Sequence, residues 1–176
     1  MTDHQHAAIV TGASSGIGRA VVERLQADYD YVACFDIETG ETDWDDEGVH
    51  EFAVDVRDPD AVADAVAAVE SVADVAALVN NAGISRAVSL ADLDPDEWDR
   101  VLDVNLKGQY VVARAVAPGM VERGEGAIVN VSSVADLPLE RIGTPEEVAD
   151  VVAFLCDGAS YVTGTVLTVD GGSMLR

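Results

Sequence analysis

Two different hydrophobic patterns meet at the segment Thr11-Gly12-Ala13-Ser14-Ser15-Gly16-Ile17-Gly18. An apolar run, residues 7–10, precedes it, and residues 17–25 carry apolar side chains at helical spacing. This pattern predicts a strand, a glycine-rich turn and a helix. In such a turn one glycine permits the bend, one lets the backbone approach a pyrophosphate, and one lets the helix pack closely on the strand. The free N–H groups at the helix start favour phosphate. The segment therefore predicts a dinucleotide site; a glycine turn without a ligand is the alternative.

A carboxylate follows at a suitable distance. The apolar run 31–35 is typical of a buried parallel strand, and it ends at Asp36, 18 residues after Gly18. A carboxylate at about this spacing binds the hydroxyls of the adenosine ribose and repels a 2′-phosphate. No arginine lies beside Asp36 or in the glycine turn. We therefore expect NAD rather than NADP, the alternative being a solvated carboxylate at a strand end.

Strand and helix patterns alternate along the rest of the chain. Three Asp-Pro or Thr-Pro pairs, beginning at Asp58, Asp94 and Thr144, predict helix starts with a cap and a proline in the first turn. Asn105 and Lys107-Gly108 interrupt the long helix expected from about 95 to 116. Further strands are expected at 50–54, 75–79, 127–131 and 165–169. The order predicts an α/β fold, a Rossmann-like doubly wound parallel sheet, in a single domain, residues 1–176.

The charge is strongly negative. The 176 residues include 33 acids and 10 bases, for a net charge of −23. Self-repulsion at this charge destabilises a compact state unless salt screens it, and the screening length falls to about 3 Å at 1 M. We expect adaptation to a salt-rich cytoplasm, with an ordinary acidic protein as the alternative. The absence of a basic patch argues against nucleic-acid binding.

Other classes of site are not indicated. Cys34 and Cys156 are isolated within apolar runs, so they predict neither a disulfide nor a metal site. The N-terminus lacks a signal-like segment and no apolar run reaches the length of a membrane span. We therefore expect a cytoplasmic protein with no metal and no membrane partner.

Taken in order, these motifs resemble the short-chain dehydrogenase/reductase family, particularly its 3-oxoacyl-acyl-carrier-protein reductase and glucose dehydrogenase-like members. The matching segments are TGASSGIG (11–18), Asp36, Asp55-Val56, NNAG (80–83), VNLKG (104–108), IVNVSS (128–133), 141–155 and 160–172. The resemblance implies an oxidoreductase that transfers a hydride between a nicotinamide and an alcohol or ketone.

The resemblance also implies the site residues. Ser133 and Asn105 take the catalytic positions, with Ser132 as a neighbouring strand-end hydroxyl. The implied NAD contacts are Gly12, Ser14, Ser15, Gly16, Ile17, Gly18, Asp36, Ile37, Asp55, Val56, Asn81, Ala82, Gly83 and Val104.

One family feature is missing. A Tyr-x-x-x-Lys pair should follow the serine, with the tyrosine as general acid/base and the lysine lowering its pKa. Alcohol–ketone interconversion needs such a group, because hydride transfer accompanies proton transfer at oxygen. Only ten residues separate Ser133 from Thr144, and none is tyrosine or lysine. The chain is thus shortened between about 134 and 143, and lacks the catalytic helix, the strand after it and the substrate loop. Tyr110 is a weak substitute candidate.

The shortening leads to structural expectations. We expect residues 165–169 to take the place of the missing strand beside 127–131, giving about six strands in the order 3-2-1-4-5-6. We expect the helix at 145–155 to lie where the catalytic helix packs, leaving apolar surface and a possible homo-oligomer through the long helix 95–116.

The favoured function is an NAD-binding family member whose dehydrogenase activity is impaired. One alternative is a working enzyme with a substitute acid, Asp136 and Glu140 being merely nearby. The others are a non-enzymatic nucleotide-binding or interaction module and the product of a damaged gene.

Overall fold

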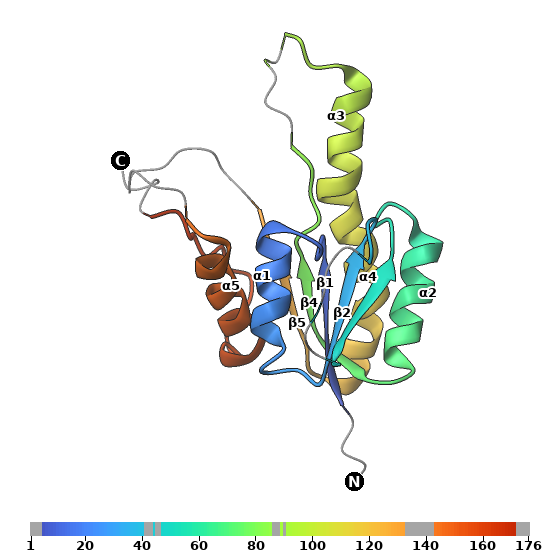
Figure 1. Cartoon of the computed structure of the whole chain (residues 1–176), viewed down its shortest axis with the longest axis vertical. Coiled ribbons are helices and arrows are strands. Elements are labelled where there is room, and N and C mark those ends of the chain that lie inside the picture. Colours follow the sequence, from blue (N-terminus) through green and yellow to red (C-terminus); the bar gives the residue numbers. More distant parts are fainter. Residues whose placement is uncertain are drawn as a thin grey trace.

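A parallel sheet forms the centre of the molecule. The computed structural model describes residues 5–40, 44, 47–85, 89, 91–132 and 143–171. Within them the strands pair in the order β3-β2-β1-β4-β5, and every neighbouring pair is parallel (Figure 1). Their bounds are β1 His6–Thr11, β2 Tyr31–Asp36, β3 Val49–Ala53, β4 Asp74–Asn80 and β5 Ala127–Asn130. The predicted doubly wound α/β fold is confirmed.

Helices cover both faces of this sheet. Along β1, Ala7 and Ile9 belong to the cluster beneath α2 (Pro59–Glu70) and α4 (Gln109–Arg123). Ala8 and Val10 point the other way, into the cluster beneath α1 (Gly16–Leu25) and α5 (Pro145–Ala153). All four side chains are fully buried. Continuous apolar runs therefore suit these strands, because both faces lie under helices.

The predicted helix starts are confirmed. The Asp58 carboxylate accepts hydrogen bonds from the N–H groups of Asp60 and Ala61 at 3.0 and 3.2 Å. Thr144 and Glu147 form a reciprocal capping box. The Glu147 N–H donates to the Thr144 hydroxyl oxygen at 3.4 Å, and the Thr144 N–H donates to the Glu147 carboxylate at 2.8 Å. These contacts satisfy N–H groups that have no partner within the helix.

The long helix contains a wider turn where the sequence predicted an interruption. Helix α3 (Pro95–Leu102) continues through the π-helical segment η1 (Asp103–Gly108) into α4. The helix also runs beyond the expected end near 116 and stops at Gly124, whose φ of 75° is the left-handed conformation that terminates helices. Figure 1 shows α3 projecting well beyond the edge of the sheet.

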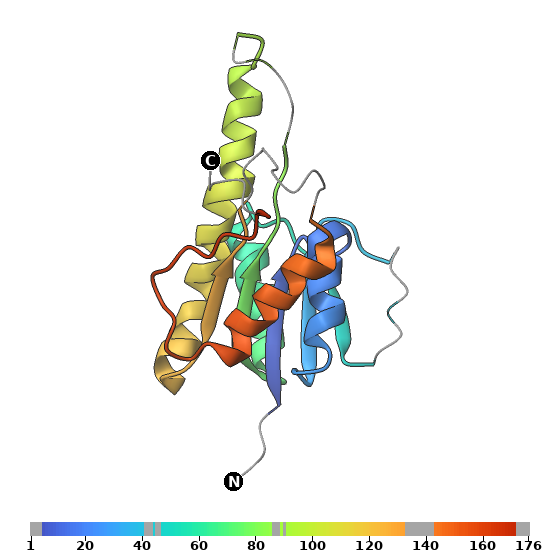
Figure 2. The same cartoon turned by 90° about the vertical axis from the view of Figure 1, so that its left-hand side faces the viewer.

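The expectation of a sixth strand is wrong. Residues 165–169 form no strand, and in the described part of the chain the sheet ends at β5 (Figure 2). The position expected for the last helix is also wrong. Buried Ala149, Val152 and Ala153 of α5 share the cluster of α1, on the face opposite α4. α5 packs against α1, and η2 (Phe154–Gly158), which follows it, lies close to β5 without pairing with it as a strand.

Candidate functional site

Three glycines give the turn after β1 its shape. Gly12 has a φ of 64°, and a Cβ built there would lie 2.8 Å from the Ala82 Cα. A Cβ on Gly18 would overlap the carbonyl oxygen of Gly12, so only glycine lets α1 start this close to β1. Gly16 has a φ of 55°, and nothing lies within 4 Å of a Cβ built on it. Two of these glycines thus serve packing, while the third leaves open space at the start of α1.

The end of β4 holds this turn in place. The Asn81 side-chain amide donates to the carbonyl oxygens of Thr11 and Gly12 at 3.1 and 3.0 Å. The buried Thr11 hydroxyl oxygen accepts hydrogen bonds from the N–H groups of Asn81 and Ala82 at 3.0 and 2.9 Å. The NNAG segment therefore contributes to the site by clamping the glycine turn.

The end of β2 contacts the same turn. Asp36 accepts a hydrogen bond from the Ser14 N–H at 3.0 Å and another from the Glu38 N–H at 3.3 Å. The Ser14 hydroxyl donates to the Glu38 carbonyl oxygen at 2.7 Å. These contacts fix the Asp36 carboxylate beside the glycine turn, where strand order brings two distant parts of the sequence together.

A cleft of about 410 Å³ opens at the carboxyl ends of the strands. Ligands of open α/β sheets bind at this edge. Of the 14 residues predicted to contact NAD, all but Ser14 and Gly18 line the cleft, and those two support the turn beneath it. The lining also contains residues that the motifs did not indicate, namely Phe35, Val54, Arg57, Ile84 and Arg100.

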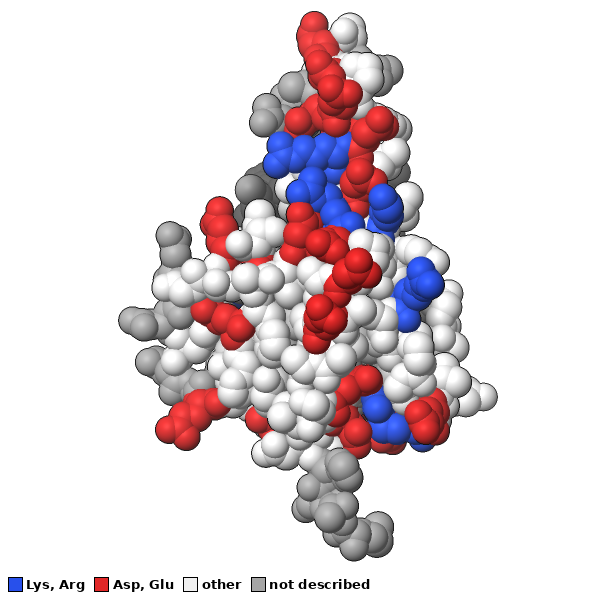
Figure 3. Space-filling view, turned by 90° about the vertical axis from the view of Figure 1, so that its right-hand side faces the viewer, with Lys and Arg blue, Asp and Glu red and all other residues white. Residues whose placement is uncertain are grey.

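Two of these additional residues are basic. Arg57 binds Asp55 through its side chain, with a closest distance of 2.5 Å from Nη2 to Oδ2. This hydrogen bond from Arg57 holds the pKa of Asp55 below its ordinary value. Arg100 reaches the cleft from α3. Figure 3 shows Lys and Arg gathered over the lower part of α3, with Asp and Glu beside them.

Asn105 lies in η1 and supports the loop that borders the cleft. Its Oδ1 accepts a hydrogen bond from the Ile84 N–H at 2.8 Å, and its amide donates to the Ile84 carbonyl oxygen at 2.9 Å. A Cβ on Gly108 would lie 2.7 Å from Val56 Cγ2, so Gly108 lets η1 approach the cleft wall. The π-helical turn thus positions one side of the site, a common place for such turns.

The described residues of the cleft do not include the expected proton-transfer groups. Ser133 lies outside the described residues, and its neighbour Ser132 is exposed. Lys107 pairs with Asp103 at 3.3 Å, and Tyr110 is 61% exposed. Among the described residues that line the cleft there is neither a tyrosine nor a lysine.

Other kinds of site were sought over the same part of the chain. No described group of three or more His, Cys, Asp or Glu residues could hold a metal ion. Cys34 is buried and Cys156 half-buried, and both are free thiols. No helix among the described residues has the length and apolarity needed to cross a membrane.

The sheet, with a glycine turn and a carboxylate at its strand ends, defines an α/β protein of the Rossmann type. The family model described as short chain dehydrogenase matches residues 6–140, and one described as enoyl-(acyl carrier protein) reductase matches 134–174. The chain belongs to the short-chain dehydrogenase/reductase family of oxidoreductases, whose members use nicotinamide cofactors.

Known relatives align with nearly the whole chain. A 3-oxoacyl-acyl-carrier-protein reductase of Thermotoga maritima is 30% identical over 238 positions, covering 95% of this chain and 97% of the relative. A 2-(R)-hydroxypropyl-CoM dehydrogenase of Xanthobacter autotrophicus is 32% identical, covering 93% and 96%. The ligand-free aldohexose dehydrogenase of Thermoplasma acidophilum superposes with a TM-score of 0.87 at 28% identity, covering 98% and 95%. The 238 aligned positions of the first relative exceed the 176 residues of this chain by 62, so at least that many face a gap in this chain.

Proposed function

We propose that this protein binds NAD(H) in the cleft and is a short-chain dehydrogenase/reductase whose hydride transfer to or from a small alcohol or ketone is impaired. The observation that carries the proposal is the meeting of the glycine turn and Asp36 in one cleft at the strand ends.

The residues around the turn suit a dinucleotide. Ser15 makes no side-chain cap to α1, and the first turn of this helix contains no acid. The N–H groups at the helix start are therefore available to a pyrophosphate, and the open space over Gly16 allows the phosphates to approach the backbone. Asp36 would bind the ribose hydroxyls, with Ile37, Asp55 and Val56 toward the adenine.

Selectivity for NAD over NADP would come from Asp36. Its carboxylate is held beside the cleft and would repel a 2′-phosphate. Arg57 is a nearby cation that could neutralise a 2′-phosphate, but its guanidinium is bound to Asp55. We therefore expect the preference predicted from the sequence to hold despite the arginines found in the cleft.

The rate of the reaction would be limited by proton transfer. A bound nicotinamide supplies the hydride acceptor or donor. Asn105 and Ser133 remain for catalysis, Asn105 by shaping the cleft wall through Ile84. A serine hydroxyl can polarise a carbonyl but is a weak acid, and no described tyrosine or lysine lines the cleft. Without an activated acid/base, rates should fall by the 10²–10⁴-fold typical of such groups.

Calorimetric titration of NAD and NADP in molar KCl tests the binding proposal. We expect saturable NAD binding and weaker NADP binding. Equal affinities for NAD and NADP would contradict the role of Asp36. If neither cofactor bound, the result would favour a chain without a nucleotide function.

The long helix is proposed as a contact between two copies of the chain. Trp98, Leu106 and Tyr110 are 51%, 66% and 61% exposed, and with Leu102 they recur every four residues along α3, η1 and α4. Residues at this spacing share a helix face, and an apolar stripe of this size favours association.

Adaptation to high salt is proposed from the charge of −23. Screening of self-repulsion should raise the melting temperature in molar KCl. Circular dichroism melts in low and molar KCl measure this, and equal melting temperatures would contradict it.

A further inference from the structure

No described strand pairs with the outer edge of β5, although η2 (Phe154–Gly158) lies close to β5. In the described part of the chain β5 pairs with β4 alone and lies at the end of the sheet. Its Ile128 is 41% exposed, whereas β1 and β2 are largely buried. Proteins usually protect such an edge with charged residues, a proline or a covering segment. β5, Ala-Ile-Val-Asn, contains neither charge nor proline.

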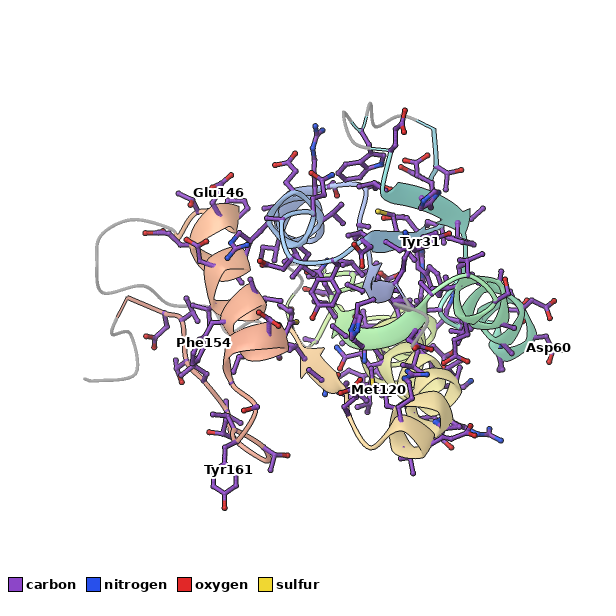
Figure 4. All side chains as sticks on the ribbon, turned by 90° about the horizontal axis from the view of Figure 1, so that it is seen from below. Tyr31, Asp60, Met120, Glu146, Phe154 and Tyr161 are labelled. Atoms are coloured by element: carbon purple, nitrogen blue, oxygen red, sulfur yellow. The ribbon has the colours of Figure 1, made fainter. Side chains whose placement is uncertain are left out.

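The same chain contains a strand-like segment that has no partner strand. Residues 165–169 read Thr-Val-Leu-Thr-Val, four of them β-branched, which is a strong strand composition. They form no strand, and Val166, Leu167 and Val169 are 91%, 51% and 46% exposed. Tyr161, just before them, points away from the rest of the molecule in Figure 4.

We propose that residues 165–169 of a second copy of this chain pair with the outer edge of β5, and that the exchange is reciprocal. Each copy carries both the acceptor edge of β5 and a donor segment, so a two-fold pair satisfies both, and the outer edge of each sheet moves to the added strand. The sheet of each copy thereby gains a sixth strand. This contact is distinct from the helix stripe and does not depend on cofactor binding.

The charge distribution supports a second copy as the occupant. Two chains of −23 repel each other, so association is favoured where neither surface is charged. Residues 127–130 and 165–169 contain no Asp, Glu, Lys or Arg. The two segments are therefore compatible in both charge and strand propensity.

Solution mass in molar KCl tests the exchange. A Leu106→Glu background places a charge in the middle of the helix stripe and so weakens that contact, and in it we expect a dimer by light scattering. Val166→Pro or Thr168→Pro in that background should give a monomer, because proline cannot donate to a strand ladder. Tyr161→Ala, fully exposed and outside the segment, is the matched control and should stay dimeric. A monomeric background protein, or proline variants that remain dimers, would overturn the proposal. Circular dichroism verifies that each variant is folded.

Disulfide trapping locates the contact. Single variants Ile128→Cys and Leu167→Cys, refolded together and oxidised, should form a mixed disulfide dimer. Burial raises the pKa of both native thiols, Cys34 and Cys156, to about 12, so they remain protonated and compete little. Val72→Cys, 54% exposed on another part of the molecule, replaces Ile128→Cys as the control and should trap little. In the double variant, an internal disulfide in a monomer would show that the segment closes onto its own β5 and would contradict the exchange.

Discussion

β1 and β5 belong to the same parallel sheet but have opposite surroundings. Residues 7–10 of β1 are fully buried, whereas β5 alternates between half-buried and exposed positions. The contacts that hold the glycine turn come from Asn81 and Asp36, both in the first half of the chain. The comparison teaches that the glycine turn is held by contacts made within the first half of the chain, whereas β5, at the edge of the described sheet, is covered only in part.

Two phenylalanines, one buried in the sheet and one exposed after α5, should give the largest difference in the free energy of unfolding. Phe35 in β2 is fully buried, whereas Phe154 in η2 (Phe154–Gly158) is 53% exposed. Phe35→Ala should lower the free energy of unfolding by roughly 3–5 kcal/mol, because it removes a buried ring and leaves a cavity. Phe154→Ala should cost less than about 1 kcal/mol. Urea unfolding measures both, and similar losses would show that the comparison is mistaken.

Gly18 tests how closely the nucleotide side is packed. Gly18→Ala should lower the free energy of unfolding by roughly 1–3 kcal/mol and weaken NAD binding, because the added Cβ overlaps the Gly12 carbonyl oxygen. Gly143→Ala is the control, since no described atom lies closer to its Cβ than the Glu147 carboxylate at 3.7 Å. Melts and NAD titrations of the two variants compare them. A harmless Gly18→Ala would mean that α1 can move away from β1.

Asp36 tests selectivity with the fold intact. Asp36→Asn should weaken NAD binding by roughly ten- to hundredfold, since hydrogen bonds to a charged group contribute about 1.5–3 kcal/mol. NADP binding should weaken less or improve, because repulsion of the 2′-phosphate disappears. Glu38→Gln, on the same loop, should change neither affinity. Calorimetry reads all of these affinities, and parallel losses for both cofactors would remove Asp36 from selectivity.

The Asp55–Arg57 pair should give the smallest effect. The pKa of Asp55 is lowered in the folded state, chiefly by the Arg57 hydrogen bond, so its stabilisation is present above the unfolded value of about 3.9. It is lost as pH falls through the lowered folded value. Arg57→Gln should therefore be less stable than the parent at pH 7, by about 0.2–1 kcal/mol, and equal to it near pH 2. Thermal melts against pH measure the difference, with Arg114→Gln as control. A pH-independent difference would indicate lost packing instead.

Local signals predicted the turn after β1 and the helix starts well. The glycine turn, Asp36 and the Asp58 and Thr144 caps depend on neighbours within a few residues or on strand order, and a sequence displays both. The prediction of a strand at residues 165–169 was wrong because strand propensity does not indicate which strand a segment pairs with. Arg57 and Arg100 were missed because they lie outside the motifs and reach the cleft only through tertiary packing. The spacing of Asp55 and Arg57 was the available signal for their pairing.

The central claim is that the residues proposed to bind NAD are present, whereas the acid/base that should transfer the proton is missing. Its most direct test is to mix the protein with NADH in molar KCl, verify binding by fluorescence, add a panel of ketones and aldoses, and follow absorbance at the nicotinamide band. We predict that NADH binds saturably and is oxidised at least about a hundredfold more slowly than by a family member that retains the tyrosine and lysine. Oxidation at a comparable rate would contradict the claim and would mean that another group donates the proton in place of the tyrosine.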